Sequence, residues 1–194
     1  MRLLKMGASL RLRYKGDGAN VYLQYKGPGF RRDGLLYRSE FSSKRLDKIV
    51  TEESHHDVVH FRDVSVARIL AQPENQEMGR ALRRQLGAGV VPRLKTAPIV
   101  CSYQKDKFIV DLGSAFLEPS LDRIFAFQVN ARGGLHSASA FWEYENEIKT
   151  EGEGLQDKLD HLDELLDFDR KISKKFDLKI ERLDKYHRVA SCFL

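Results

Sequence analysis

The 194-residue sequence contains only two cysteines and no long apolar run. Two cysteines, Cys101 and Cys192, are too few for a disulfide scaffold, which favours a reducing compartment. No stretch approaches the roughly 20 apolar residues that a membrane-spanning helix requires. Residues 1–7 show neither a sustained apolar run nor a small-residue cleavage site, so we expect no signal peptide. Together these absences predict a cytoplasmic protein without a membrane partner.

The composition excludes disorder as the dominant state, because 42% of the residues are hydrophobic and can bury a core. Lys and Arg together number 33, and Asp and Glu number 28, which gives a net charge of +5. This mild excess suits an anionic partner such as a phosphate ester, and it also suits an ordinary soluble surface. Whether the charged side chains face inward or outward decides between an anionic partner and an ordinary surface.

The order of local patterns predicts a single α+β domain made of four segments. They are a first antiparallel meander, a helical insertion, a second β half and C-terminal helices, at 1–43, 44–95, 98–149 and 153–194. Gly27-Pro28-Gly29 is expected to end the second strand, Gly87 to end the first helical segment, and Phe176–Asp177 to interrupt the last one. The strands are expected at 9–14, 21–26, 35–41, 99–103, 108–112, 121–129 and 141–149.

Alternation along the first strands places polar side chains on one face, because residues i and i+2 of a strand share a side. Arg11 and Arg13 point to one side of the first strand, and Leu10 and Leu12 point to the other. On the second strand, one side carries Tyr22, Gln24 and Lys26. On the third strand, one side carries Leu36, Arg38 and Glu40.

The strand at 141–149 places three carboxylates on one side, Glu143, Glu145 and Glu147, with Trp142 on the other. Carboxylates in a row repel one another and need cations, which are either arginines of facing strands or a divalent metal. Oxygen-only ligands select hard cations, so the metal would be Mg²⁺ or Mn²⁺.

Two interpretations of these charged faces stay open. In the first, they are the solvent-exposed side of an antiparallel sheet. In the second, they line the polar interior of a β-barrel, and the two helical segments cover the apolar outer side. A polar interior of this kind can hold a polyphosphate together with its metal ions.

Several strings in the sequence resemble those of one protein family and occur in the same order. They are Leu4–Arg13, Tyr22–Pro28, Tyr37–Glu40, Leu121–Ile124, Phe141–Glu147 and Lys185–Tyr186. The family is the CYTH superfamily, named for class IV adenylate cyclase and thiamine triphosphatase and also called the triphosphate tunnel metalloenzymes. The resemblance covers most of the chain, and its most specific part is Y-K-G-P at Tyr25–Pro28 following L-R-L-R.

The resemblance implies a closed antiparallel β-barrel of about eight strands, open at both ends, with helices packed outside. It implies metal-dependent hydrolysis of inorganic triphosphate or a small organic triphosphate. Carried over to this sequence, the phosphate ligands are Arg11, Arg13, Lys26 and Arg38, and the acidic tunnel residue is Glu40. The ligands of Mg²⁺ or Mn²⁺ are Glu143, Glu145 and Glu147, with Asp122 as a looser match.

One part of the family pattern is missing. The family's N-terminal E-x-E-x-K strand has no counterpart before Gly7, so we expect either a start upstream of Met1 or a barrel that is incomplete at its first strands. The incomplete case favours a non-catalytic polyphosphate- or nucleotide-binding module, and a class IV type adenylate cyclase is the other alternative to a triphosphatase. The expected partner is a small-molecule triphosphate or nucleotide rather than a sequence-specific nucleic acid, and a homodimer stays open.

A histidine cluster at 55–60 is a further candidate site. His55 and His56 are adjacent and cannot both face one site on a helix, so we expect a surface cluster rather than a zinc site.

Overall fold

A computed structural model describes residues 2–15, 20–32, 35–46, 66–94, 99–129, 134–150, 154–181 and 183–193. The chain divides into two compact units, residues 1–98 and 99–194. The single CYTH-like domain over 1–194 stays a prediction.

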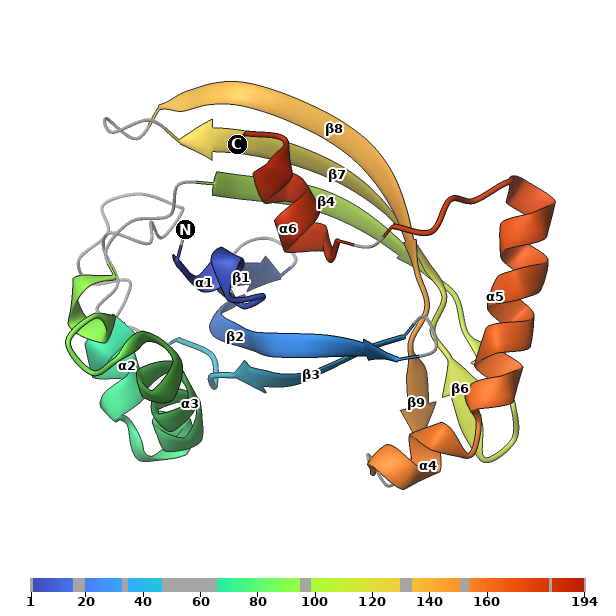
Figure 1. Ribbon diagram of the computed structural model, residues 1–194, viewed down its shortest axis with the longest axis horizontal. Helices are drawn as coiled ribbons and strands as arrows, with labels where there is room; N and C mark the ends of the chain where they lie inside the picture. The colour runs from blue at the N-terminus through green and yellow to red at the C-terminus, as the bar shows by residue number, and fades with distance from the viewer. Residues whose placement is uncertain are drawn as a thin grey trace. The chain divides into compact units, whose positions relative to one another are not determined.

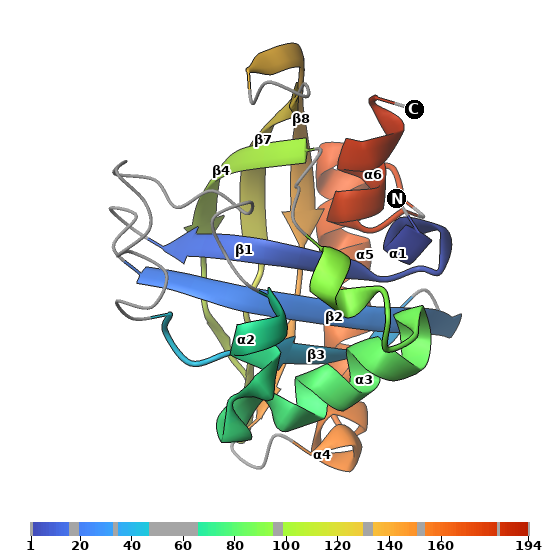
Figure 2. The ribbon, with the colours of Figure 1, turned by 90° about the vertical axis from the view of Figure 1, so that its left-hand side faces the viewer.

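The first unit contains the predicted antiparallel meander. Its strands are β1 (Ser9–Lys15), β2 (Asn20–Arg32) and β3 (Leu35–Ser42). They lie side by side in this order, and each neighbouring pair is antiparallel (Figure 2). The three strands that the alternation predicts are therefore confirmed.

Helices cover the apolar side of this sheet. In chain order they are α1 (Arg2–Lys5), α2 (Val66–Ala71), the 3₁₀ turn η2 (Pro73–Asn75), α3 (Gln76–Leu86) and the 3₁₀ turn η3 (Val91–Arg93). Figure 2 shows α2 and α3 over the sheet, where Leu23 and Tyr25 of β2 are buried in one core with Leu82 of α3. The predicted helix end at Gly87 is confirmed, and its φ of 88° lies in the left-handed region that favours glycine.

The Gly27–Pro28 pair forms a β-bulge instead of ending β2 as expected. Lys26 pairs with Glu40 and Gly29 pairs with Arg38, so β2 holds one more residue than β3 between these pairs. A bulge tolerates proline because the extra residue needs no hydrogen bond to the neighbouring strand. The strand therefore continues beyond the bulge to the hairpin with β3.

The second unit contains two three-stranded antiparallel sheets. The larger sheet has the order β4 (Ile99–Lys107), β7 (Ser120–Val129) and β8 (Leu135–Glu145). The smaller one has the order β5 (Val110–Asp111), β6 (Ala115–Leu117) and β9 (Ile148–Thr150). The single strand predicted at 141–149 is thus two strands, and Asn146 and Glu147 connect them.

Three helices follow the strands, α4 (Leu155–Leu159), α5 (Leu162–Phe176) and α6 (Lys185–Ser191). The predicted interruption is confirmed, because α5 ends at Phe176 and Asp177 has a φ of 52°. The C-terminal segment is otherwise less helical than expected. Ile180 lies between α5 and α6 and is 86% exposed.

Helices and antiparallel sheets confirm the predicted α+β class. The described strands form three three-stranded sheets, and no closed barrel is found among them. The triphosphate tunnel therefore stays a prediction. In the same part of the chain, no helix is both long and apolar enough to cross a membrane.

In the second unit, α6 covers the charged side of the β4–β7–β8 sheet, whereas we expected helices on the apolar side. Figure 1 shows α6 beneath the curved sheet, where Val189 packs with Ile124 and Ala126 of β7. These two β7 residues share their side with Asp122. The side is charged at one end and apolar at the other, so α6 can bury apolar side chains there. Trp142, on the opposite side, is 55% exposed.

Candidate functional site

The charged face of the first sheet brings the four predicted phosphate ligands onto three adjacent strands. Strand pairing places Arg11 opposite Gln24, and Lys26 opposite Glu40. Arg13 lies two residues after Arg11 along β1, and Arg38 lies two residues before Glu40 along β3. Both cations are therefore on this same side of the sheet. The face thus combines Arg11, Arg13, Lys26 and Arg38 with the carboxylate of Glu40.

Glu40 binds two of these cations. Its carboxylate lies 2.8 Å from Nζ of Lys26 and 3.0 Å from Nε of Arg38. Burial raises the pKa of Glu40, but Lys26 and Arg38 outweigh burial, so the pKa lies below its ordinary value. Burial, with the nearby charges of Arg38 and Arg11, lowers the pKa of Lys26 below its ordinary value, although Glu40 acts in the opposite direction. The Lys26 ammonium would therefore gain from a second anion.

A chain of polar side chains crosses the same face. Nε of Arg11 donates a hydrogen bond to Oε1 of Gln24 at 2.9 Å, and Nε2 of Gln24 donates to Oγ of Ser42 at 3.4 Å. Beside it lies a shallow pocket of about 100 Å³, lined by Gln24, Lys26, Glu40, Phe41 and Ser42. The pocket admits a group of a few atoms rather than a whole nucleotide.

Two buried polar atoms on β1 have no hydrogen-bond partner in the part of the chain that the structure describes. They are Oγ of Ser9 and Nε of Arg13, and both residues share the side of Arg11. A buried polar atom without a partner costs about 1–3 kcal/mol. The Arg13 guanidinium therefore favours a ligand that accepts hydrogen bonds at this face.

In the second unit, three of the predicted metal ligands come together on the side that α6 covers. Asp122 of β7 lies opposite Lys105 of β4 and opposite Glu143 of β8. Glu145 follows two residues later on the same side of β8. Asp122 is completely buried, with 0% of its surface exposed. We call Asp122, Glu143 and Glu145 the carboxylate cluster.

Two lysines that the sequence analysis missed neutralise this cluster. Nζ of Lys185 binds the carboxylate of Asp122 and lies 2.8 Å from that of Glu145. Nζ of Lys105 lies 3.2 Å from Glu145 and 3.7 Å from Asp122. Strand parity could have found Lys105, but no local pattern pairs Lys185 with Glu145, which is 40 residues away along the chain.

The two glutamates of the cluster differ strongly in pKa. Burial raises the pKa of Glu143 to about 7, although Lys185 and Arg188, 3.7 Å away, act in the opposite direction. Burial also raises the pKa of Glu145, but Lys185 and Lys105 outweigh burial and lower it to about 2. Of these two glutamates, Glu143 is therefore the one that holds a proton near neutral pH.

We expect the unfolding free energy of the second unit to fall as the pH rises from about 5 to about 8 because of Glu143. Its pKa is about 7 in the folded unit against an ordinary value of 4.5, so the folded chain holds a proton that the unfolded chain releases. Glu143→Gln imitates the protonated form and should flatten the profile by about 1–3 kcal/mol. Urea unfolding followed by the fluorescence of Trp142, the single tryptophan, measures the profile. Parallel profiles for the two proteins would contradict this expectation.

The predicted row of three carboxylates on one strand is wrong at Glu147, because β8 ends at Glu145. Glu147 is exposed and lies 2.8 Å from Nζ of Lys149. Among the described residues, no group of three or more His, Cys, Asp or Glu side chains is arranged to hold a metal ion. Mg²⁺ or Mn²⁺ stays a prediction, and the histidine cluster at 55–60 lies outside the described residues.

A hydroxyl, an imidazole and a carboxylate also meet in the second unit. Oγ of Ser114 lies 3.1 Å from Nε2 of His161, and Nδ1 of His161 lies 3.6 Å from Oε1 of Glu164. This order is typical of a nucleophile, a base and an acid. The second distance exceeds a hydrogen bond, and the Ser114 side chain is exposed. The set therefore lacks the oriented base that a nucleophile needs.

Comparisons with known proteins assign no family to this chain. It matches no model of a protein family, and searches of curated proteins and of solved structures give no significant match. The relationship to the CYTH superfamily therefore depends on the strings in the sequence and stays a prediction.

Proposed function

We propose that this protein binds a triphosphate group, inorganic or part of a small organic molecule, at the charged face of the first unit. The observation that carries the proposal is the gathering of four cations with a single carboxylate on three paired strands. They are Arg11, Arg13, Lys26, Arg38 and Glu40. Like charges on one face repel one another, and a bound polyanion offsets that repulsion.

The distribution of charge along the chain supports an anionic ligand at this unit. Residues 1–98 contain 19 Lys and Arg against 10 Asp and Glu, whereas residues 99–194 contain 14 against 18. The positive excess of the chain thus belongs to the unit that carries the face. Such a field concentrates anions near it and weakens as salt increases.

The side chains on this face differ in how they bind phosphate. The planar guanidinium groups of Arg13 and Arg38 suit paired hydrogen bonds to phosphate oxygens. The Lys26 ammonium acts as a compact point charge, and its lowered pKa means that a phosphate oxygen would stabilise its charged form. The face therefore supplies both kinds of phosphate contact within one sheet.

The proposed reaction is hydrolysis of the bound triphosphate, for which the resemblance to the CYTH superfamily is the support. Attack by water on the terminal phosphorus would break a phosphoanhydride bond and give phosphate and a diphosphate. Attack by a ribose 3′-hydroxyl on the α-phosphorus of a nucleoside triphosphate would instead give a cyclic nucleotide and release pyrophosphate. Bound Mg²⁺ or Mn²⁺ would neutralise charge on the phosphate oxygens. Lys105 and Lys185 already neutralise the carboxylate cluster, so its carboxylates do not fit a divalent metal while both lysines are bound there. The same pairing favours binding without turnover as the second candidate function.

Calorimetric titration of the full chain with tripolyphosphate tests the binding. We expect tripolyphosphate to bind more tightly than pyrophosphate or phosphate, with an affinity that falls as salt rises. Absence of binding at about 1 mM tripolyphosphate, which corresponds to about −4 kcal/mol, would overturn the proposal. Phosphate release with Mg²⁺ or Mn²⁺ then separates hydrolysis from binding alone.

A further inference from the structure

Helix α6 supplies cations to the carboxylate cluster from its own first turns. Nζ of Lys185 binds Asp122 and lies 2.8 Å from Glu145, and a guanidinium nitrogen of Arg188 lies 3.7 Å from Glu143. Lys185 is the first residue of α6, where the positive end of the helix dipole disfavours a cation. The carboxylates, rather than the helix, therefore account for an ammonium at this position.

When Glu143, whose pKa is about 7, is ionised, the cluster is electrically balanced only with α6 in place. Its three carboxylates face three cations, and two of these cations belong to α6. The set consists of Asp122, Glu143 and Glu145 against Lys105, Lys185 and Arg188. A divalent cation added to this set would create an excess of positive charge, whereas loss of an α6 cation would leave an excess of negative charge.

The oxygen atoms of the cluster are arranged around the Lys185 ammonium. Nζ of Lys185 bridges Oδ2 of Asp122 and Oε2 of Glu145. Oδ1 of Asp122 and Oε2 of Glu143 are buried and form no hydrogen bond with the residues that the structure describes. Carboxylate oxygens are the ligands that hard divalent cations prefer. The ammonium thus lies between oxygen atoms of the kind that such a cation would need.

We propose that Lys185 occupies the cation position of the carboxylate cluster, so that α6 and a divalent cation compete for the same carboxylates. The helix has seven residues and adds no strand to the sheet; it is attached by Val189 in the apolar core and by a 3.4 Å hydrogen bond from Arg188 to the carbonyl of Trp142. The segment that joins it to α5 carries Ile180, which is 86% exposed. The strand pairs β4–β7 and β7–β8 contain no residue of α6, so their hydrogen bonds do not depend on the helix. The proposal does not depend on phosphate binding by the first unit.

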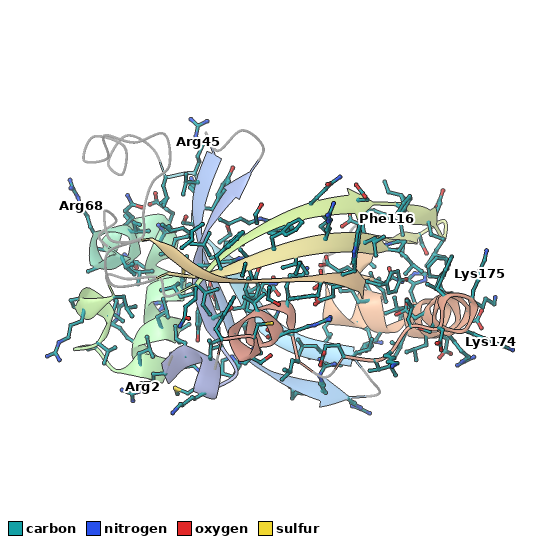
Figure 3. All side chains as sticks on the ribbon, turned by 90° about the horizontal axis from the view of Figure 1, so that it is seen from above. Arg2, Arg45, Arg68, Phe116, Lys174 and Lys175 are labelled. Carbon is teal, nitrogen blue, oxygen red and sulfur yellow. The ribbon has the colours of Figure 1, made fainter. Side chains whose placement is uncertain are left out.

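Binding of Mn²⁺ to the full chain, measured by electron paramagnetic resonance in phosphate-free buffer, tests the competition. Lys185→Met removes the ammonium and keeps an apolar side chain of similar length. The variant should bind Mn²⁺ roughly tenfold more tightly than the wild type or better, because the cluster then has a negative net charge. Lys174→Met is the matched control, since Figure 3 shows Lys174 extending from α5 at the surface, and it should bind like the wild type.

Nuclear magnetic resonance locates the bound ion. The ring of Tyr103 lies 5.7 Å from Nζ of Lys185, so Mn²⁺ at the cluster should broaden the Tyr103 signals in Lys185→Met and leave them sharp in the wild type. Equal Mn²⁺ affinity in the two proteins would overturn the proposal. Broadening of Tyr103 in the wild type at the same Mn²⁺ concentration would overturn it as well.

A second variant keeps the test decisive if Lys185→Met does not fold. Lys185→Gly leaves space that ethylammonium can enter, and this small cation should restore the fold by filling the position of the lost ammonium. Ethylammonium should then raise the Mn²⁺ concentration needed for binding. Mn²⁺ binding that is indifferent to ethylammonium would overturn the proposal. Because no phosphate is present, either result leaves the tripolyphosphate titration of the first unit unaffected.

Discussion

Asp122→Ala is expected to lower the unfolding free energy of the second unit by about 3–5 kcal/mol. The Asp122 side chain is completely buried and binds Nζ of Lys185, and Lys105 lies 3.7 Å away. Its removal leaves buried ammonium groups with only part of their negative charge. Urea unfolding followed by the fluorescence of Trp142 in β8 reports on this unit, because the chain has one tryptophan.

Two comparisons separate the loss of this pair from a general loss of charge. Asp106→Ala removes an exposed carboxylate from β4 and should change the unfolding free energy by no more than about 0.5 kcal/mol. The double variant Asp122→Ala/Lys185→Met should lose less than the sum of its single variants, because it leaves no ammonium at this position. Strictly additive losses would show that the two side chains do not act as a pair.

Lys26→Ala is expected to weaken tripolyphosphate binding roughly 10- to 100-fold, because a hydrogen bond to a charged group contributes about 1.5–3 kcal/mol. Lys26 borders the pocket of the first unit, and its ammonium lies 2.8 Å from Glu40. Without Lys26, a ligand phosphate meets the Glu40 carboxylate with one cation fewer to offset it. Calorimetric titration of the two proteins measures the change, with and without Mg²⁺.

The matched control removes an equal charge from the other side of the same unit. Arg80 is exposed on α3, the helix that packs on the apolar side of the sheet. Arg80→Ala should weaken binding less than about threefold, since a distant exposed charge is screened by salt. Small and equal effects of both variants would favour the interpretation that the charged face is an ordinary solvated surface.

Strand alternation was sufficient to place the predicted phosphate ligands, because side-chain direction depends on parity within a single strand. Arg11 and Arg13 share the charged side of β1, as the sequence predicts, and Leu10 and Leu12 pack toward the core. The bulge at Gly27–Pro28 could not be predicted in the same way. Glycine and proline also end strands, and only pairing with β3 shows that β2 continues.

The strand predicted at 141–149 shows where residue alternation fails to predict which side chains lie together. Glu143, Glu145 and Glu147 follow one alternating pattern in the sequence, but the strand ends at Glu145 and the next one begins at Ile148. Strand ends depend on the partner strand, and β8 pairs with β7 whereas β9 pairs with β6. Glu147 thus lies outside the alternation of β8, although the charges of Lys105 and Glu145 still act on its pKa.

The sequence by itself determined the α+β class, most of the strands and the side on which each strand charge lies, because these depend on residues only a few positions apart. Only the tertiary structure decided that Lys185 neutralises Asp122, which is 63 residues away along the chain. That contact depends on which side of the sheet α6 covers. Burial of Val189 against Ile124 sets this side, and a packing contact between distant segments leaves no periodic signal in the sequence.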